Sequence, residues 1–397
     1  MDYDILISGG GIAGLTAAAA FGNAGFSVLC VDPAPPVTER EAQGADLRST
    51  AFLQPAQAFL AEAGLWERLA PHAMPLQVMR IVDAGGELPE PRIVKDFDSA
   101  EISELPFGWN LPNWLLRREL SAHLHGMERV TFLPGTATTA LFTREAEARV
   151  TLSDGRRIRT RLVIAADGRN SPMREAAGIG VKTTRFGQKA LAFATTHPIP
   201  HGNVSTEIHR TGGPFTLVPL PDFEGLPSSA VVWMEEGPKA EALMALDEAA
   251  FEAAMSERSC HHFGPLKLAS RRTIWPIIAQ HAESLTGQRL ALVAEAAHVV
   301  PPIGAQGLNM SLADMKVLHD LAVARPEALG EASMLDAYAR KRMPDIRARV
   351  AGITALNRAS MLSTPLLRDA RATALDALYG VKSVRKTLMQ MGLGAKG

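Results

Sequence analysis

The first 32 residues alternate between short apolar runs and small or turn-forming residues. An apolar run over residues 4–8 is followed at once by glycines, and then by small helix-compatible residues from Leu15 to Ala24. A second apolar run, residues 27–31, ends at Asp32. Short apolar runs bounded by turn residues are typical of buried strands, and Gly25 is a suitable helix stop. The pattern predicts a strand, a helix and a second strand.

Similar runs recur later in the chain. Residues 162–166 are apolar and lead into an Asp-Gly pair, and residues 290–294 form another apolar run. The second run is followed by a polar, glycine-containing segment, after which a helix is expected from about Met310. Residues 230–234 belong to a region with strand-like alternation. The order of these patterns predicts an α/β protein with more than one sheet.

The C-terminal residues 336–397 have a helical pattern, with Pro344 and Pro365 as the expected breaks. From Tyr338 onward the chain has 12 basic and three acidic side chains, although the whole chain has 41 basic and 42 acidic residues. A basic segment on an acidic body indicates either an anionic partner surface or a solvated helical face.

Residues 358–395 combine basic and apolar side chains at a spacing that fits amphipathic helices. Such helices would place an apolar face on a membrane and a basic face toward anionic lipid or an acidic partner. The alternative is that the apolar stripe packs on the rest of the protein, as most helical stripes do. The apolar positions are Leu362, Leu366, Leu367, Leu375, Leu378, Val381, Leu388, Met391 and Leu393, and the basic ones are Arg368, Arg371, Lys382, Arg385 and Lys386.

Length, charge and composition exclude several classes of protein. A chain of 397 residues predicts two or three structural units, and a formal net charge of −1 argues against a nucleic-acid binder. Two cysteines are too few for a disulfide framework or a zinc cluster, and no other metal site is indicated. The first apolar run follows acidic residues, unlike a signal peptide, and no run of 18 apolar residues occurs. We expect a cytoplasmic protein. A peripheral position at the inner face of the membrane is the alternative within that compartment.

The first glycines form a dinucleotide-binding pattern in the right context. Gly9, Gly11 and Gly14 give the spacing G-x-G-x-x-G directly after a predicted strand and at the start of a predicted helix. Glycines permit a tight turn and a close approach of the backbone to a pyrophosphate, and the helix N-terminus offers free N–H groups. An acid after the second strand, here Asp32, can accept hydrogen bonds from ribose hydroxyls. This unit does not by itself separate NAD from FAD.

Two distant segments carry a resemblance to a known family. One is the Asp167-Gly168 pair with Ser171 and Arg174, and the other is the run from Glu295 to Asn309. Together with the first motif they resemble the aromatic-ring flavoprotein monooxygenases of the para-hydroxybenzoate hydroxylase class, and most of all the ubiquinone-biosynthesis hydroxylases. Residues 46–48, 114–120 and 213–220 also match this family, so the resemblance covers nearly the whole chain.

The resemblance implies an α/β fold with a Rossmann-like FAD-binding domain, an inserted β-sheet substrate domain and a helical C-terminal segment. On this basis the FAD-binding domain is discontinuous and the substrate domain is inserted into it. The expected boundaries are 1–75, 100–180 and 280–335 for the FAD-binding domain, 76–99 and 181–279 for the substrate domain, and 336–397 for the basic helical segment.

The resemblance also implies roles for individual residues. Asp32 would hold the adenosine ribose of FAD, Arg48 and Arg117 would lie along the cofactor, and Glu295 would bind the ribityl hydroxyls. His298 is expected to be a structural hydrogen-bonding residue. No catalytic base is indicated, and Pro302, Gly304, Gln306 and Gly307 are the best candidates to position the flavin ring. The expected cofactor-binding residues are Gly9, Gly11, Ile12, Ala13, Gly14, Asp32, Arg48, Arg117, Asp167, Gly168, Glu295, Pro302, Gly304, Ala305, Gln306, Gly307, Leu308 and Asn309.

This sequence departs from the family pattern in the last motif. Ala294-Glu295 stands where the family usually has Gly-Asp, and Pro301, Ala305 and Ser311 replace a histidine and two glycines. Glu295 keeps the carboxylate on a side chain one methylene longer. Ala305 adds a methyl group near the expected position of the flavin ring.

The implied reaction is hydroxylation of an aromatic ring, here a hydrophobic polyprenylated phenol of ubiquinone biosynthesis. NAD(P)H would reduce FAD, and O2 would then form a flavin hydroperoxide that delivers oxygen to the ring. Other ubiquinone-biosynthesis proteins or a membrane surface are the expected partners of the basic segment. The alternatives are a small-phenol hydroxylase, a polyprenyl reductase, or a non-catalytic subunit, for which Glu295 and Ala305 are the only support. A halogenase is disfavoured because Trp275-Pro276-Ile277 lacks that class's tryptophan-rich signature.

Overall fold

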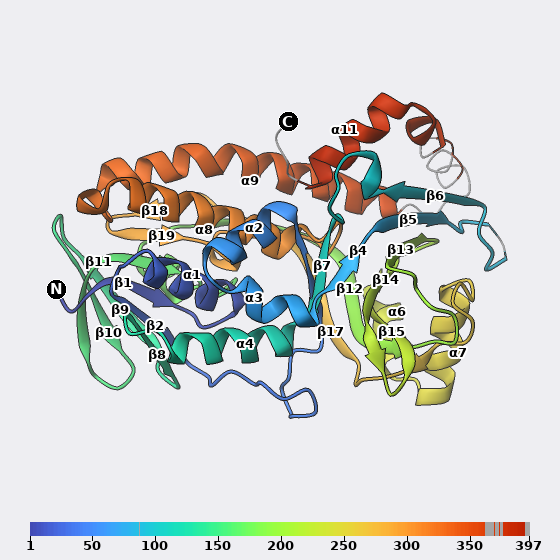
Figure 1. Cartoon of the computed structure of the whole chain (residues 1–397), viewed down its shortest axis with the longest axis horizontal. Coiled ribbons are helices and arrows are strands. Elements are labelled where there is room, and N and C mark those ends of the chain that lie inside the picture. The colour runs from blue at the N-terminus through green and yellow to red at the C-terminus, as the bar shows by residue number, and fades with distance from the viewer. Residues whose placement is uncertain (87, 362–368, 370–372, 374–375, 394–397) are drawn as a thin grey trace.

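Two large β-sheets with helices packed around them make up most of the molecule (Figure 1). The computed structural model describes residues 1–86, 88–361, 369, 373 and 376–393. The first sheet lies near the N-terminus and the second lies at the other end of the long axis. The mixed α/β architecture predicted from the sequence is confirmed.

The first sheet has a parallel core in the order β19-β11-β1-β2-β8. Its first strand and the helix that follows it, α1, are the predicted strand and helix, and Ile5, Leu6 and Ile7 are fully buried. Such continuous burial is expected when helices cover both faces of a parallel sheet. The elements are β1 (Tyr3–Ser8), α1 (Ile12–Asn23), β2 (Val28–Asp32), α4 (Asn113–His125), β8 (Val130–Pro134), β9 (Thr138–Thr143), β10 (Ala148–Leu152), β11 (Arg157–Ala165), α5 (Pro172–Ala176), β18 (Thr286–Gly287) and β19 (Leu290–Leu292).

The second sheet has the order β20-β17-β12-β15-β14-β13-β5-β6, and β16 pairs with β12. On one face, Phe193, Phe215 and Trp233 form a core with Phe251 of helix α7. The alternate residues of the same strands point to the other face, which is turned toward the first sheet. The elements are β5 (Val78–Asp83), β6 (Ile93–Asp98), β12 (Val181–Thr196), β13 (Val204–His209), β14 (Pro214–Phe223), β15 (Leu226–Glu236), α6 (Gly237–Met244), α7 (Glu248–Arg258), β16 (Lys267–Leu268), β17 (Thr273–Ala282) and β20 (His298–Val299).

A small three-stranded sheet, β3-β7-β4, lies between the two large ones. Asn110 of β7 donates a hydrogen bond to the Pro219 carbonyl of β14, which joins this small sheet to the second sheet. The elements here are β3 (Ser49–Leu53), α2 (Gln54–Glu62), α3 (Trp66–Leu69), η1 (Ala70–His72), β4 (Met74–Leu76), η2 (Ser99–Glu101) and β7 (Gly108–Pro112).

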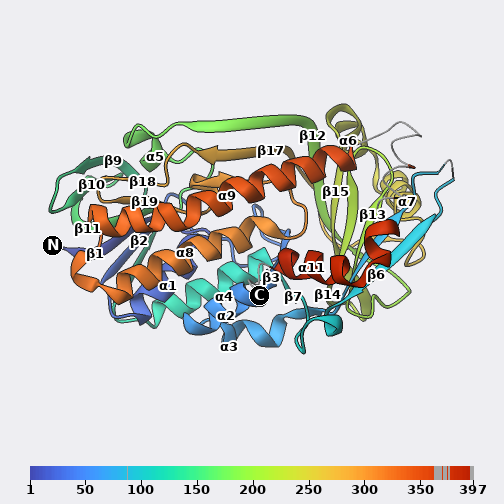
Figure 2. The ribbon, with the colours of Figure 1, turned by 90° about the horizontal axis from the view of Figure 1, so that it is seen from above.

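Strands β12 and β17 run along the molecule from the first half to the second (Figure 2). They pair antiparallel from Val181 to Ala192, and the register shifts between Arg185 and Lys189. Gly187, inside this bulge, has a φ of +72°. The two halves are therefore joined by a two-stranded ribbon with one irregular point.

Helices α8 (Gln306–Ala324) and α9 (Ala332–Ser360) pack against each other along the first sheet, with η3 (Ala294–Ala296) and η4 (Pro326–Ala328) at their flanks. The expectation that the first of these helices begins near Met310 was wrong by one turn, because the glycine-rich segment before Met310 is already helical from Gln306.

The expected break at Pro344 is also wrong. Proline lies inside the continuous 29-residue helix α9. Proline removes one backbone hydrogen bond, but buried side chains in the turns on either side, Arg342 and Ile346, hold the helix against its neighbours. The other expected break, Pro365, lies outside the described residues.

Helix α11 (Lys382–Leu393) packs against the edge of the second sheet, above β5 and β6 in Figure 1. Met389 and Leu393 are buried with Leu53 and Phe107. The opposite side of the helix carries exposed Leu388 and Met391. The basic and apolar positions expected at Leu362, Leu366, Leu367, Arg368, Arg371 and Leu375 lie outside the described residues.

In the part of the chain that the structure describes, each helix is too short or too polar to cross a lipid bilayer.

Candidate active site

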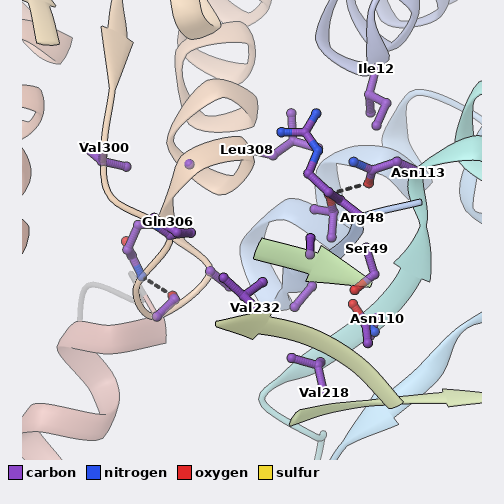
Figure 3. A pocket seen from close by; sticks show the side chains of 18 of the residues that line it. Ile12, Arg48, Ser49, Asn110, Asn113, Val218, Val232, Val300, Gln306 and Leu308 are labelled. Atoms are coloured by element: carbon purple, nitrogen blue, oxygen red, sulfur yellow. Dashed lines mark hydrogen bonds between the residues drawn. The ribbon is translucent and has the colours of Figure 1, made fainter. Parts of the chain in front are cut away.

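A cavity of about 510 Å³ lies between the two large sheets. Its wall combines the N-terminus of α1, the start of β3, the segment from Ala294 to Ser311 and the inner face of the second sheet. Figure 3 shows side chains from these elements around one space, with Ile12 and Arg48 on one side and Val218 and Val232 on the other. Residues predicted to bind the cofactor are therefore brought together with a second, apolar wall.

The three glycines of the first motif have different structural roles. A Cβ on Gly9 would overlap the backbone of Ala166, and one on Gly14 would overlap the Gly9 carbonyl. A Cβ on Gly11 would meet no atom within 4 Å. Gly9 and Gly14 are thus required by the packing of the chain itself, whereas Gly11 keeps open a space that faces the cavity.

The N-terminus of α1 is open toward this space. Gly11 is the N-cap residue and provides no side-chain hydrogen bond to the first turn. Ile12 and Ala13, whose N–H groups lie in that turn, line the cavity. A helix N-terminus carries unsatisfied N–H groups and a partial positive charge, so this end of the cavity suits an anion such as a pyrophosphate.

Asp32 lies at the end of β2, behind the glycine turn. Its carboxylate accepts a 2.6 Å hydrogen bond from the N–H of Gly10 and a 2.9 Å bond from the N–H of Ala34. These bonds fix the turn, and the described cavity wall does not include Asp32. Its contact with a ribose stays a prediction.

Arg48 is held at the cavity wall by Asp46. The two side chains form a bidentate pair with distances of 2.8 and 2.7 Å, and Asn113 donates a further hydrogen bond to Asp46. Burial by itself would raise the pKa of Asp46, but the hydrogen bonds and charge of Arg48 outweigh it and lower the pKa. The guanidinium of Arg48 lies 5.4 Å from the ring centre of Trp275. The arginine is thus preorganised beside the cavity.

Arg117 of α4 also lines the cavity. Its Nε is buried and has no hydrogen-bond partner among the described residues. A buried guanidinium nitrogen without a partner is costly, so this atom is placed to donate to a bound acceptor.

Gly168 and Glu295 lie at the cavity on neighbouring segments, and Arg169 joins them. Arg169 donates to both oxygens of Glu295 at 3.1 and 3.4 Å. The sequence analysis missed Arg169, although its place directly after the Asp167-Gly168 pair was an available signal. Asp167 itself is not part of the cavity wall and accepts hydrogen bonds from Ser8 and the Met173 N–H. Burial raises the pKa of Asp167.

The loop from Pro302 to Leu308 closes one side of the cavity. Gly304 and Ala305 both have positive φ values, 61° and 56°, and Ala305 is the N-cap residue of α8. Asn309 does not line the cavity but holds this loop to β3, because its amide donates to the Ala51 carbonyl and accepts from the Leu53 N–H. The loop is thus anchored where it meets the helix.

A second anchor links the same loop to α9. Gln306 accepts a 2.7 Å hydrogen bond from Arg349 and donates to the carbonyls of Gly304 and Gly392. Arg349 is paired in turn with Asp345 of α9. The cavity loop therefore contacts both C-terminal helices.

His298, which precedes the loop, is buried and lies 2.6 Å from a carboxylate oxygen of Asp314. The other oxygen of Asp314 accepts from Arg342 at 2.7 Å. His298 makes the predicted hydrogen bond, and because it also lines the cavity its purely structural role stays a prediction.

The wall formed by the second sheet was not predicted residue by residue. It is mostly apolar, with Val218 and Val232 among its side chains, but includes Ser205, Glu207 and Thr216. Val218 and Thr216 lie within residues 213–220, which match the family, whereas Ser205 and Glu207 come from a strand with ordinary alternation and no motif distinguishes them. A cavity wall lined mostly by apolar side chains suits the binding of a hydrophobic small molecule.

The site as a whole fits a flavin dinucleotide. The open space at Gly11 and the unpartnered Nε of Arg117 lie at the end of the cavity where the α1 N-terminus would meet a pyrophosphate. The apolar wall of the second sheet then lies beyond the loop that would support the ring.

Comparison with known proteins agrees with this geometry. Residues 2–352 match the family model described as FAD binding domain. The ubiquinone hydroxylase UbiL of Rhodospirillum rubrum is 32% identical over 394 residues, which cover 98% of this chain and 89% of that protein. The 3-demethoxyubiquinol 3-hydroxylase of Escherichia coli is 27% identical, with 98% of each chain covered.

Solved structures share the fold. The p-nitrophenol 4-monooxygenase PnpA of Pseudomonas putida superposes with a TM-score of 0.80 at 19% identity, covering 99% of this chain and 98% of that one. With the family model spanning most of the sequence, the chain belongs to the FAD-binding family of aromatic-ring monooxygenases that includes the ubiquinone hydroxylases.

Proposed function

We propose that this protein hydroxylates the aromatic ring of a polyprenylated phenol in ubiquinone biosynthesis, with FAD as its cofactor and NAD(P)H and O2 as co-substrates. The observation that carries the proposal is that a dinucleotide-binding end and an apolar wall meet in the same cavity. The names of the relatives support the choice of a ubiquinone precursor over a small phenol.

The chain would hold FAD through residues at three places. The N–H groups of Ile12 and Ala13 would meet the pyrophosphate, with Arg117 donating from α4. Glu295, oriented by Arg169, would accept from the ribityl hydroxyls. The backbone of the loop from Pro302 to Leu308 would support the ring and place N–H dipoles near its developing charge.

Bound FAD supplies the redox chemistry, taking electrons from NAD(P)H and activating O2. The protein orients the phenol against the ring and excludes water from the cavity. Apolar side chains such as Val218 and Val232 would serve this exclusion, which limits side reactions with water.

We also propose that α11 brings the enzyme to an anionic membrane, where a polyprenylated phenol would reside. Leu388 and Met391 are 43% and 66% exposed on this helix, and Val381 precedes it with 50% exposure. Lys382 is exposed in the first turn of α11, whereas Arg385 is already paired with Glu101. Exposed apolar side chains on a helix that also carries basic side chains are the pattern of an interfacial helix.

The catalytic proposal is tested with the purified protein, NAD(P)H and a panel of prenylated and plain phenols. We expect visible flavin absorption and a hydroxylated product from the prenylated phenols, identified by mass. A product from plain phenols alone would favour the small-phenol alternative. Bound flavin without product from any phenol would contradict the proposal.

The membrane proposal is tested by co-sedimentation with vesicles of phosphatidylglycerol and phosphatidylcholine. We expect binding that falls as salt rises, since each basic residue near an anionic surface contributes about 1 kcal/mol. Lys382→Glu with Lys386→Glu should abolish it and retain flavin. The control is Arg340→Glu with Lys341→Glu, which makes the same charge change on the exposed side of α9. A role for α11 would be contradicted if both double variants lost vesicle binding equally, or if the parent protein did not bind vesicles at low salt.

A further inference from the structure

Three acidic side chains line the described cavity, and two of them are neutralised at its cofactor end. Asp46 is paired with Arg48, and Glu295 with Arg169. The third, Glu207, lies on β13 in the second sheet. It is therefore the acid placed against the wall where a phenol would bind.

We propose that Glu207 accepts the proton of the phenolic substrate and that His209 positions its carboxylate. This rests on the proposed function. The two residues are separated by one position on a strand, so their side chains share the sheet face that is turned to the cavity. Oε1 of Glu207 lies 2.7 Å from Nε2 of His209. The side chains are 18% and 16% exposed, so the pair is largely shielded from bulk water.

The tautomer of His209 follows from this contact. An ionised carboxylate only accepts hydrogen bonds, so Nε2 must carry a hydrogen and donate it to Glu207. Nδ1 is buried and has no hydrogen-bond partner among the described residues. The imidazole is thus held through Glu207, and Glu207 is held through one of its two oxygens.

Among the described residues, His209 is the only side chain that forms an ion pair with Glu207. The residues beside it on the neighbouring strands are Thr216 of β14 and Ile81 of β5, neither of which is charged. By strand register, Asp83 of β5 and Lys95 of β6 lie on the same face, and they pair with Arg92 and Asp376. The second oxygen of Glu207 is therefore available to a substrate hydroxyl.

The step moves one proton and no electrons. The phenol O–H bond breaks and an O–H bond forms on Glu207, so the electron pair stays on the phenolic oxygen and enriches the ring carbons ortho and para to it. Those carbons become better nucleophiles toward an electrophilic oxygen. The proton returns to the product or passes to water when the cavity opens.

The test compares Glu207→Gln with Glu207→Asp and with the control Glu236→Gln, which changes an exposed acid at the end of β15. We expect Glu207→Gln to lower kcat for hydroxylation by about 100-fold, the size typical of a lost general base, with little change in KM. Glu207→Asp should recover part of the rate. Flavin content should be the same in all variants, because Glu207 lies outside the cofactor end.

The pH–rate profile separates a chemical role from a structural one. In the parent, kcat should fall on the acid side as Glu207 takes up a proton from solvent, and this fall should be absent from the residual rate of Glu207→Gln. His209→Asn should lower kcat but retain the decrease of kcat at low pH. If Glu207→Gln had the same kcat and the same pH profile as the parent protein, the proposal would be overturned while the hydroxylase function would stand. A parent inactive on every phenol would overturn both.

Discussion

Gly11 and Gly14 stand three residues apart in one motif, yet they restrict the sequence for different reasons. Gly14 lets α1 pass close to the carbonyl of Gly9, whereas Gly11 has empty space where a side chain would project. One glycine is needed to fold and the other to bind. Sequence alone assigns both to the same fingerprint, because the spacing contains no record of which atom each Cβ would meet.

We therefore expect Gly11→Val to leave the fold intact and to remove FAD, since the new side chain would occupy the pyrophosphate space. Gly14→Val should fail to fold or lose several kcal/mol of stability, because its Cβ would overlap backbone. Thermal unfolding of the apoproteins and flavin absorbance after reconstitution measure both effects. A Gly11→Val protein that purifies with full flavin would contradict the assignment.

Ala294 and Ala305 replace glycines of the family pattern, and both have a backbone conformation that favours glycine. Their φ values are 55° and 56°. A residue with a Cβ is destabilised by about 1–2 kcal/mol in this region of backbone conformation. Glycine avoids this strain, but its greater conformational entropy in the unfolded chain offsets part of the benefit. The departures are thus tolerated at a cost in stability.

Ala294→Gly and Ala305→Gly should each raise the free energy of unfolding by about 0.5–1 kcal/mol. Ala313→Gly, inside α8, is the matched control and should lower it by about 1 kcal/mol. Urea unfolding of the apoproteins provides the values. Destabilisation by all three changes would show that the two alanines are unstrained.

The Asp46–Arg48 pair links stability to pH. Because the pKa of Asp46 is lowered in the folded protein, its contribution is present above the unfolded value of about 3.9 and is lost as pH falls through the folded pKa. Asp46→Asn should be less stable than the parent at neutral pH, and the difference should shrink below about pH 4. Unfolding curves across this range test the sign, which a constant difference would contradict.

The parts of the candidate site that belong to a sequence motif with a fixed backbone geometry could be predicted. The parts in which side chains from distant segments come together only in the folded protein could not. Spacing identified the glycines of the first motif, of which Gly11 lines the cavity and Gly9 and Gly14 do not. The family resemblance pointed to Arg48, Arg117 and Glu295, and all three line the cavity. It could not indicate Glu207, since a lone acid in an alternating strand has no local signature. Contacts across more than a hundred residues, such as that between Arg169 and Glu295, likewise leave no local pattern.

At the scale of elements, apolar runs and their turn residues located β1, α1 and β2 closely, because a buried strand and a small-residue helix each have a simple period. The errors came where tertiary contacts override local preference. The segment before Met310 is helical because Asn309 and Gln306 are hydrogen-bonded to β3 and α9. Helix α9 likewise passes through Pro344 under the restraint of its buried neighbours.

Pro344→Ala tests the continuity of α9. The proline ring is exposed, so its removal costs little packing, and alanine restores a backbone hydrogen bond. We expect the free energy of unfolding to rise by about 1–3 kcal/mol. Lys341→Ala, at an exposed site in the preceding turn, controls for helix propensity and should change it little. Loss of stability in Pro344→Ala would indicate that the proline is needed for a bend.

At the scale of the whole molecule, the cavity draws its wall from both large sheets, so a ligand there contacts both halves at once. FAD should therefore stabilise the protein as one unit. Adding FAD to the apoprotein at 100 times its Kd should contribute about 2.7 kcal/mol and raise the temperature of a single unfolding transition. The Gly11→Val protein should show no such rise. This coupling would be contradicted if thermal unfolding showed two transitions and FAD raised the temperature of only one of them.

The two-stranded ribbon of β12 and β17 has a mechanical consequence. A ribbon resists stretching through its ladder of hydrogen bonds but bends where the ladder is interrupted, and here the interruption lies between Arg185 and Lys189 with Gly187 at its centre. A rotation of one half against the other would therefore bend the ribbon at this bulge and would not slide its strands along each other. The bond from Asn357 of α9 to Gln188, beside Gly187, and the bond from Asn110 to Pro219 are further links that such a rotation would have to strain.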